Sequence, residues 1–338
     1  MPRKLRALAL VAATAVALPA LAACGGGDDG PSITVYNAQH EQLITQIVPD
    51  FEKATGIKVK LRNGSDLELA NQIVAEGKAS PADVFLTENS PAMTLVDGAG
   101  LLTKVEPAAL KPIPRQYVPA DRDWTGFLAR STVLLYNTQK VQQADLPTSL
   151  LDLAKPAWKG RVAYAPNGAD FQAIVSAVLQ LEGEDATRTW LQGLKANGRV
   201  YDGNNSVLQA VNAGDVDAGI TYHYYWARDR QENGENSDSS ALHYFTDGDP
   251  GAFLSVSAAG VLASSSKQSD AQRFVEYLTS AQAQQAMGDS YALEYPLNPE
   301  ASLPPEVKAL DALQPPKVDL TQLNSSKVVD LMQQVGLL

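Results

Sequence analysis

Hydrophobic and polar positions along the chain follow two periods, one typical of strands and one typical of helices. Residues 33–36 read as a strand, and apolar residues then recur at helical spacing from Ile44 to Phe51 until Gly56 ends the helix. Residues 57–61 alternate in polarity and read as a second strand. The pattern therefore predicts a strand–helix–strand unit at the start of the folded chain.

The same alternation continues through the middle of the sequence. The pattern predicts strands at 83–87, 132–136, 161–164 and 217–222, helices at 67–76, 91–99, 150–153, 171–181 and 186–196, and a helix capped by Asn205 and Ser206 that runs into Gly214. Because helices and strands alternate, we expect an α/β fold with parallel sheets and helices on both faces.

The first residues have the form of a bacterial lipoprotein signal. Three basic residues precede an apolar stretch at 7–20, which ends in Leu-Ala-Ala before Cys24. This cysteine is the only one, so an intrachain disulfide or a thiolate metal cluster is excluded. We expect removal of residues 1–23 and lipidation of Cys24 rather than a transmembrane helix, because the apolar stretch is too short to span a bilayer.

Residues 24–30 are rich in glycine and predict a flexible tether between the lipid and a folded domain. The rest of the 338-residue chain is long enough for two lobes. We expect one lobe from residues 31–130 and 254–305, and the other from 131–253 and 306–338. The element order, the signal and the two lobes predict a periplasmic-binding-protein fold (type II-like) with a ligand cleft between the lobes. Such a solute-binding protein would be held at the outer face of the cytoplasmic membrane.

The charge of the chain limits the classes of partner that it is expected to bind. The formal net charge is −11, which argues against nucleic acid and mildly favours a cationic ligand.

Two adjacent tyrosines, Tyr224 and Tyr225, are the most informative candidate for ligand chemistry. Tyrosines of this kind are often ordinary packed aromatics with hydrogen-bonded hydroxyls. Two neighbouring phenols are also good ligands for a hard cation, because phenolate and carboxylate oxygens suit Fe(III).

Four separated motifs resemble the ferric-binding protein family of bacterial iron ABC importers. They are Val-Tyr-Asn-Ala-Gln-His at 35–40, Phe-Glu-Lys-Ala-Thr-Gly-Ile-Lys-Val at 51–59, Pro-Ala-Asp-Val-Phe-Leu-Thr-Glu at 81–88 and His-Tyr-Tyr-Trp at 223–226. The resemblance continues in order to Tyr-Ala-Leu-Glu-Tyr-Pro at 291–296.

This resemblance implies that His40, Glu88, Tyr224 and Tyr225 hold iron across the cleft. It also implies an ABC permease and its ATPase as partners, and we expect a monomer. His40 and Glu88 follow predicted strands, at the carboxyl ends where α/β sheets place ligands. Each residue alone is ordinary, since His40 could simply start a helix and Glu88 could be a solvated acid.

The family's iron sites also take a small anion, and the candidate residues for it are Arg130, Gly168, Ala169 and Asn205. The chain departs from the family here, because Asp170 stands where serine is usual. A carboxylate at that position would repel phosphate unless it faced away. The resemblance therefore favours carbonate, which the Arg130 guanidinium could clamp with two donors.

Two other functions remain open. The same fold could bind a small organic cation such as thiamine or a polyamine, with Tyr36, Trp226 and Glu88 forming a cage. The protein could also be a ligand sensor rather than a transport component. An enzyme is not expected, because His40 begins a zinc-protease pattern that lacks its second histidine at Ile44, and no nucleophile motif is present.

Overall fold

The computed structural model describes residues 30–305 and 307–338. The predicted signal peptide, Cys24 and most of the tether lie outside these residues. None of the helices in this part of the chain has the length and apolar character needed to cross a bilayer.

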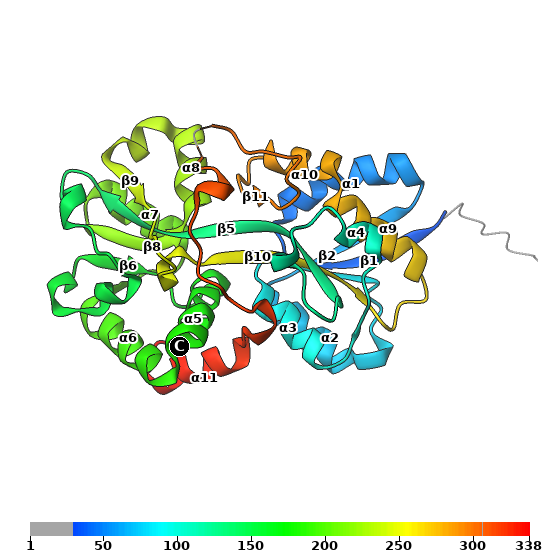
Figure 1. The fold of residues 1–338 in the computed structure, drawn as a ribbon, viewed down its shortest axis with the longest axis horizontal. Helices are drawn as coiled ribbons and strands as arrows, with labels where there is room; N and C mark the ends of the chain where they lie inside the picture. Colours follow the sequence, from blue (N-terminus) through cyan, green and yellow to red (C-terminus); the bar gives the residue numbers. More distant parts are fainter. Residues whose placement is uncertain (1–29, 306) are drawn as a thin grey trace, which may run out of the picture.

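One sheet of eleven strands runs through both halves of the molecule (Figure 1). Its main path is β2 (Lys58–Asn63), β1 (Ser32–Asn37), β3 (Val84–Thr87), β10 (Leu254–Leu262), β5 (Trp124–Asn137), β8 (Ala218–Tyr222), β6 (Val162–Tyr164) and β7 (Arg199–Val200). Three short strands pair beside this path: β4 (Leu102–Thr103), β9 (Ser240–His243) and β11 (Tyr295–Pro296).

The expectation of wholly parallel sheets is wrong. β1 is parallel to β2 and β3, and β6 is parallel to β7 and β8. β10 is antiparallel to β3 and β5, and β5 is antiparallel to β8 and β9. The sheet is therefore mixed, because β5 and β10 run between the two parallel blocks rather than extending either.

β5 connects the two halves. Its first part pairs with β10, and from Thr132 onward it pairs with β8 and β9. The junction falls beside Arg130 and Ser131, where β5 leaves β10. β5 is longer than the predicted strand because the buried residues from Trp124 to Ala129 extend it toward the N-terminus. The lobe boundaries given above stay a prediction.

Eleven α-helices of the described chain cover the sheet. They are α1 (Glu41–Thr55), α2 (Asp66–Glu76), α3 (Ser90–Gly98), α4 (Pro107–Leu110), α5 (Ala169–Glu182), α6 (Glu184–Asn197), α7 (Asn204–Ala213), α8 (His223–Asn233), α9 (Gln268–Thr279), α10 (Ala281–Gly288) and α11 (Ser325–Gln334). In Figure 1, α1, α9 and α10 lie with β1 and β2 in one half, and α5 to α8 lie in the other. The C-terminal α11 packs against α5 and α3.

Alternating side chains of β1 explain why helices cover both faces. Val35 packs in one buried cluster with residues of α1 and α9, including Phe51 and Phe274. Its neighbour Tyr36 packs in another with residues of α2 and α3, including Ile73. Successive strand residues point to opposite faces, so each face buries its own helices.

Most predicted elements are confirmed, with one difference in helix type and one at a helix start. Gly56 ends α1 with a positive φ of 75°, a conformation that glycine adopts without steric cost. The segment at 150–153 is a 3-10 helix, Leu150–Ala154, rather than an α-helix. α7 begins at Asn204 with Gly203 in the capping position, so Asn205 lies inside the first turn instead of capping it.

Candidate metal centre

His40 and Glu88 lie on neighbouring loops at the carboxyl ends of parallel strands. β1 and β3 pair directly, and the backbone N–H of Ala38 donates to the carbonyl of Leu86 at 2.8 Å. His40 occupies the capping position of α1, and Glu88 lies just before α3. His40 Nε2 is therefore 3.7 Å from Glu88 Oε1.

The paired tyrosines come from the other half of the sheet. β8 ends at Tyr222 and α8 begins at His223, so Tyr224 and Tyr225 both lie in the first turn of α8. The Tyr224 hydroxyl donates to Glu88 Oε1 at 3.3 Å, and its ring meets the His40 ring edge-on at 5.6 Å. The two tyrosine rings stack with their centroids 4.2 Å apart. The structure thus brings together all four residues that the resemblance implied.

Asp170 is a member of the same cluster that was not expected as a ligand. It lies in the first turn of α5 and is buried. Its Oδ2 accepts from the Tyr225 hydroxyl at 2.9 Å and from Asn204 Nδ2 at 2.8 Å, and it is 3.5 Å from the Tyr224 hydroxyl. The substitution of aspartate for serine was the available sequence signal. The carboxylate faces the tyrosines rather than turning away from them.

Several helices begin around this cluster. α1, α3, α5, α7 and α8 start at or next to residues that contact it. The N-terminal end of a helix carries partial positive charge and free backbone N–H groups, so it stabilises anions nearby. The fold therefore favours a concentration of negative donors here.

Burial shifts the pKa values of the cluster in a consistent direction. It raises the pKa of Tyr224 and of Tyr225 well above the ordinary value, and the nearby Asp170 carboxylate raises both further. Burial and then Asp170 also raise the pKa of Glu88. Burial lowers the pKa of His40. At neutral pH the phenols are consequently protonated and the imidazole is neutral, which is the form of histidine that binds metals.

Asp66 and Asn89 support the Glu88 loop. Asp66, the first residue of α2, accepts from the backbone N–H groups of Glu88 and Asn89, both at 2.9 Å. The Asn89 amide donates to Asp66 Oδ2 and to Asp170 Oδ1, each at 3.2 Å, and its oxygen accepts from the Ser255 hydroxyl at 2.6 Å. Asn89 therefore links the two halves of the cluster to β10. Burial raises the pKa of Asp66 to about 7.

The candidate anion residues differ in their burial and in the groups that they contact. Arg130 is fully buried and its terminal nitrogens donate to protein groups, among them Glu294 Oε2 at 2.5 Å. Gly168 and Ala169 lie at the start of α5 next to Asp170, and the Gly168 N–H donates to the Ala165 carbonyl at 3.3 Å. Asn205 is exposed, and it is Asn204 that reaches the cluster.

The two other histidines use their ring nitrogens outside the cluster. His223 is fully buried, accepts from the Ser131 N–H at 3.2 Å and stacks on Tyr295 at 4.3 Å. His243 Nε2 lies 3.0 Å from the Pro147 carbonyl.

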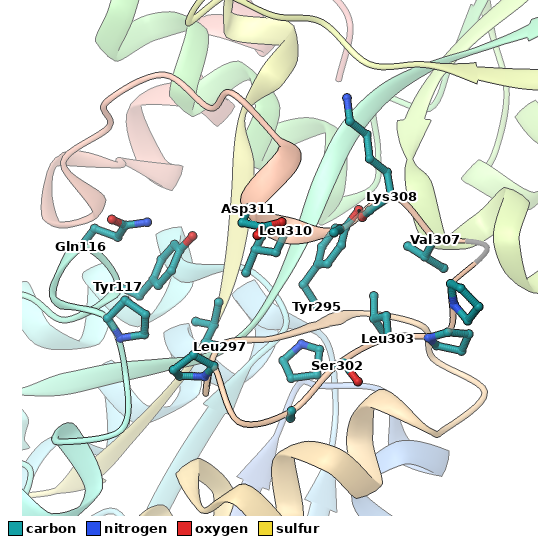
Figure 2. Close-up of a pocket in the computed structure, with 17 residues that line it drawn as sticks. Gln116, Tyr117, Tyr295, Leu297, Ser302, Leu303, Val307, Lys308, Leu310 and Asp311 are labelled. Atoms are coloured by element: carbon teal, nitrogen blue, oxygen red, sulfur yellow. Dashed lines mark hydrogen bonds between the residues drawn. The ribbon is translucent and has the colours of Figure 1, made fainter.

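A sizeable cavity lies apart from this chemistry. It encloses about 630 Å³ between the turn at Arg115–Tyr117, β11 and the segment 299–311 (Figure 2). Its walls are mostly proline and aliphatic side chains, and none of the cluster residues lines it. A second cavity of about 380 Å³ does reach the cluster, through Tyr225, Arg228 and Tyr291. Of the cluster residues, Tyr225 alone lines this second cavity.

One other group of acids lies close together, at Asp97, Asp121 and Asp123. Lys104 Nζ is 2.6 Å from Asp123, and Asp121 is exposed. Such solvated acidic groups are common, and this one offers no phenol or imidazole to an ion.

Comparisons with known proteins agree with this geometry. Residues 46–315 match the family model described as bacterial extracellular solute-binding protein. The chain is 55% identical over 306 residues to the Fe(3+)-binding periplasmic protein of Serratia marcescens, covering 90% of each chain. It is 36% identical over 340 residues to the major ferric iron-binding protein of Neisseria gonorrhoeae, covering all of both chains.

Solved structures give the same result. The fold superposes on iron-bound HitA from Pseudomonas aeruginosa with a TM-score of 0.85 and 40% identity, covering 91% of this chain and 100% of that one. It also superposes on the Trichodesmium protein IdiA (FutA) in complex with iron and citrate, with a TM-score of 0.79 and 26% identity, covering 90% and 99%.

Proposed function

Because the chain belongs to the bacterial extracellular solute-binding proteins, within their ferric iron-binding members, we propose that it captures Fe(III) between its two halves for import. The observation that carries the proposal is the meeting of Tyr224 and Tyr225 with two carboxylates beside His40. His40 and Glu88 come from loops that follow parallel strands in one half, and Asp170 and the tyrosines come from the first turns of α5 and α8 in the other half.

The donor set suits ferric iron in particular. Fe(III) prefers hard anionic oxygens, and the cluster offers phenolate and carboxylate oxygens of this kind. We assign His40, Glu88, Tyr224 and Tyr225 as ligands, with the neutral imidazole as the one softer donor. The iron displaces the phenolic protons as it binds, because the raised tyrosine pKa values leave both phenols protonated in the empty site.

We further propose that Asp170 takes the role of the small anion. Its Oδ2 already lies 2.9 Å from the Tyr225 oxygen, and Asn89 and Asn204 hold the carboxylate in place. A fixed carboxylate at this position supplies negative charge and oxygen donors, and it repels phosphate. On this proposal, iron binding does not need carbonate, which the resemblance favoured as the synergistic anion.

The rest of the function follows from the family. The iron-loaded protein presents its cargo to an ABC permease driven by an ATPase, as a monomer without catalytic activity. Lipidation at Cys24 would keep it at the outer face of the cytoplasmic membrane. Its extracytoplasmic location agrees with relatives that are named periplasmic.

The organic-cation alternative has less support. A cage for thiamine or a polyamine would need the ring faces of Tyr36 and Trp226 beside Glu88. The Arg62 guanidinium already lies 5.1 Å from the Tyr36 ring centroid, and the Arg230 guanidinium lies 5.3 Å from that of Trp226. A sensor would bind iron in the same way. The sensor alternative therefore differs from the proposal only in which protein the iron-loaded form contacts.

A titration with ferric citrate tests the proposal. The purified protein should develop the visible tyrosinate-to-iron charge-transfer band and saturate at one iron per chain. Tyr277→Phe is the matched control, since this hydroxyl donates to the Ile47 carbonyl at 3.1 Å, away from the cluster. Repeating the titration without carbonate and phosphate tests the role given to Asp170. Absence of colour at saturating ferric citrate would contradict the ferric site.

A further inference from the structure

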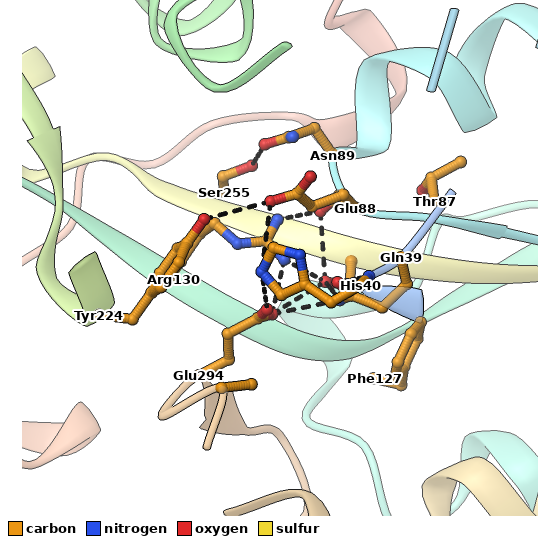
Figure 3. A network of polar contacts seen from close by, with 12 residues as sticks. Gln39, His40, Thr87, Glu88, Asn89, Phe127, Arg130, Tyr224, Ser255 and Glu294 are labelled. Carbon is orange, nitrogen blue, oxygen red and sulfur yellow. Dashed lines mark hydrogen bonds and ion pairs between the residues drawn. The ribbon is translucent and has the colours of Figure 1, made fainter. Parts of the chain in front are cut away.

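Glu294 is a buried carboxylate that neither the sequence motifs nor the proposed function uses. It lies just before β11, and its side chain is fully buried. One oxygen, Oε2, is committed to protein donors: Arg130 Nη2 at 2.5 Å and Gln39 Nε2 at 3.2 Å. Figure 3 shows these side chains converging from the loop after β1, from β5 and from the loop before β11. The hydrogen bonds to Oε2 therefore fix the position of the Glu294 side chain.

The other oxygen has a different environment. Glu294 Oε1 lies 3.2 Å from His40 Nε2, yet neither atom has a hydrogen-bond partner among the residues that the structure describes. The two atoms lie within ion-pair distance but do not form a hydrogen bond. Buried polar atoms without partners are rare in folded proteins and call for an explanation. Two neighbouring donors that do not bond to each other are arranged as two ligands of one ion would be.

The separations between donor atoms form a continuous series. His40 Nε2 lies 3.2 Å from Glu294 Oε1 and 3.7 Å from Glu88 Oε1. The Tyr224 hydroxyl lies 3.3 Å from Glu88 Oε1 and 3.5 Å from Asp170 Oδ2. Asp170 Oδ2 lies 2.9 Å from the Tyr225 hydroxyl. These six atoms match in number an octahedral set of ligands.

The charges also balance. Three carboxylates and two phenolates exceed the charge of a ferric ion by two. Two guanidinium groups lie against the cluster: Arg130 pairs with Glu294, and Arg228 lies 5.5 Å from the ring centroids of Tyr224 and Tyr225. A set of buried charges with no net excess is less costly than one with a surplus.

We propose that Glu294 is a further iron ligand, donating through Oε1 beside His40 while Arg130 holds Oε2. The inference rests on the proposed function, because it concerns the same iron site. The role of Arg130 on this account is to aim and neutralise a ligand, rather than to clamp an exogenous anion.

The test compares full-length wild type with Glu294→Gln, which keeps the shape of the side chain and removes its charge. Iron affinity is measured by competition with citrate, and the charge-transfer band is recorded for each loaded protein. Asp83→Asn is the matched control, because it neutralises a buried carboxylate that pairs with Lys267, outside the cluster. Glu294→Asp is the second variant if Glu294→Gln does not fold, since it keeps a charge for Arg130 and shortens the reach toward His40.

We expect the iron affinity of Glu294→Gln or Glu294→Asp to fall at least about 100-fold. That is the upper end of the losses in metal affinity caused by substituting residues that contact metal ligands. The band should move to longer wavelength, because iron that loses an anionic donor accepts tyrosinate charge more readily. Asp83→Asn should leave both unchanged. An unshifted band in the Glu294 variants would overturn the inference, whether their iron affinity equals that of the wild type or is weaker. A colourless wild type would instead contradict the proposed function.

Discussion

Iron uptake by this site should release protons, and the number released can be worked out from the structure. Tyr224 and Tyr225 have pKa values raised above their ordinary range, so both hydroxyls are protonated at pH 7. Each must lose its proton to bind iron as phenolate. We therefore expect two protons per iron at neutral pH.

The sign and size of the pH dependence follow from this count. Protons leave on binding, so affinity rises with pH and falls as the solution becomes acidic. Two protons correspond to about 100-fold in affinity per pH unit, or about 2.7 kcal/mol. The pKa of Glu88 is also raised by burial and Asp170. Where Glu88 is still protonated it contributes a third proton, and the dependence steepens toward about 1000-fold per unit.

The assay counts protons in weakly buffered solution with a pH indicator while the protein takes iron from citrate, with a protein-free citrate blank. Apparent affinity is measured in parallel across pH by competition. Tyr225→Phe should release about one proton and halve the slope. Tyr277→Phe, which removes a hydroxyl outside the site, should behave as wild type. Release of less than one proton per iron by the wild type at pH 7 would refute the reasoning.

Three further predictions concern single side chains. Tyr224→Phe or Tyr225→Phe should abolish the charge-transfer band or shift it strongly while changing the melting temperature little, because only one hydroxyl is removed; an unchanged iron affinity in both would contradict their assignment. Asp170→Ser should make iron binding depend on added carbonate or phosphate, whereas the wild type binds without either; titrations in anion-free buffer distinguish the two. Asp66→Ala leaves the buried backbone N–H of Glu88 without its acceptor and should lower the free energy of unfolding by about 1–3 kcal/mol, measured in urea. Full stability of that variant would show that water replaces the carboxylate.

The candidate ligands could be predicted from the sequence because each lies within a local motif. His40, Glu88 and the tyrosine pair all follow strands whose apolar pattern is plain, and the structure brings them together. Asp170 was visible as a departure from the family pattern, but its orientation was not. That orientation depends on Asn89 and Asn204, which approach from other parts of the chain.

The remaining features required tertiary structure. Arg130 interrupts an apolar run, so the sequence suggested that a strand began after it, whereas β5 continues through it. The charge is tolerated because Glu294, distant in sequence, pairs with it in the buried interior. No periodicity or spacing connects these two residues. For the same reason the antiparallel course of β5 and β10 through the middle of the sheet was missed.

The hydrogen bonds within the cluster bear on iron release as well as on capture. Phenols of Tyr224 and Tyr225 donate to Glu88 and Asp170, so protons satisfy the buried carboxylates when iron is absent. Leaving such carboxylates buried without partners would be costly. Iron and protons therefore compete for the same oxygens, and either can complete the buried network. A permease need not overcome the full affinity of the site if it admits protons to these oxygens as the two halves separate.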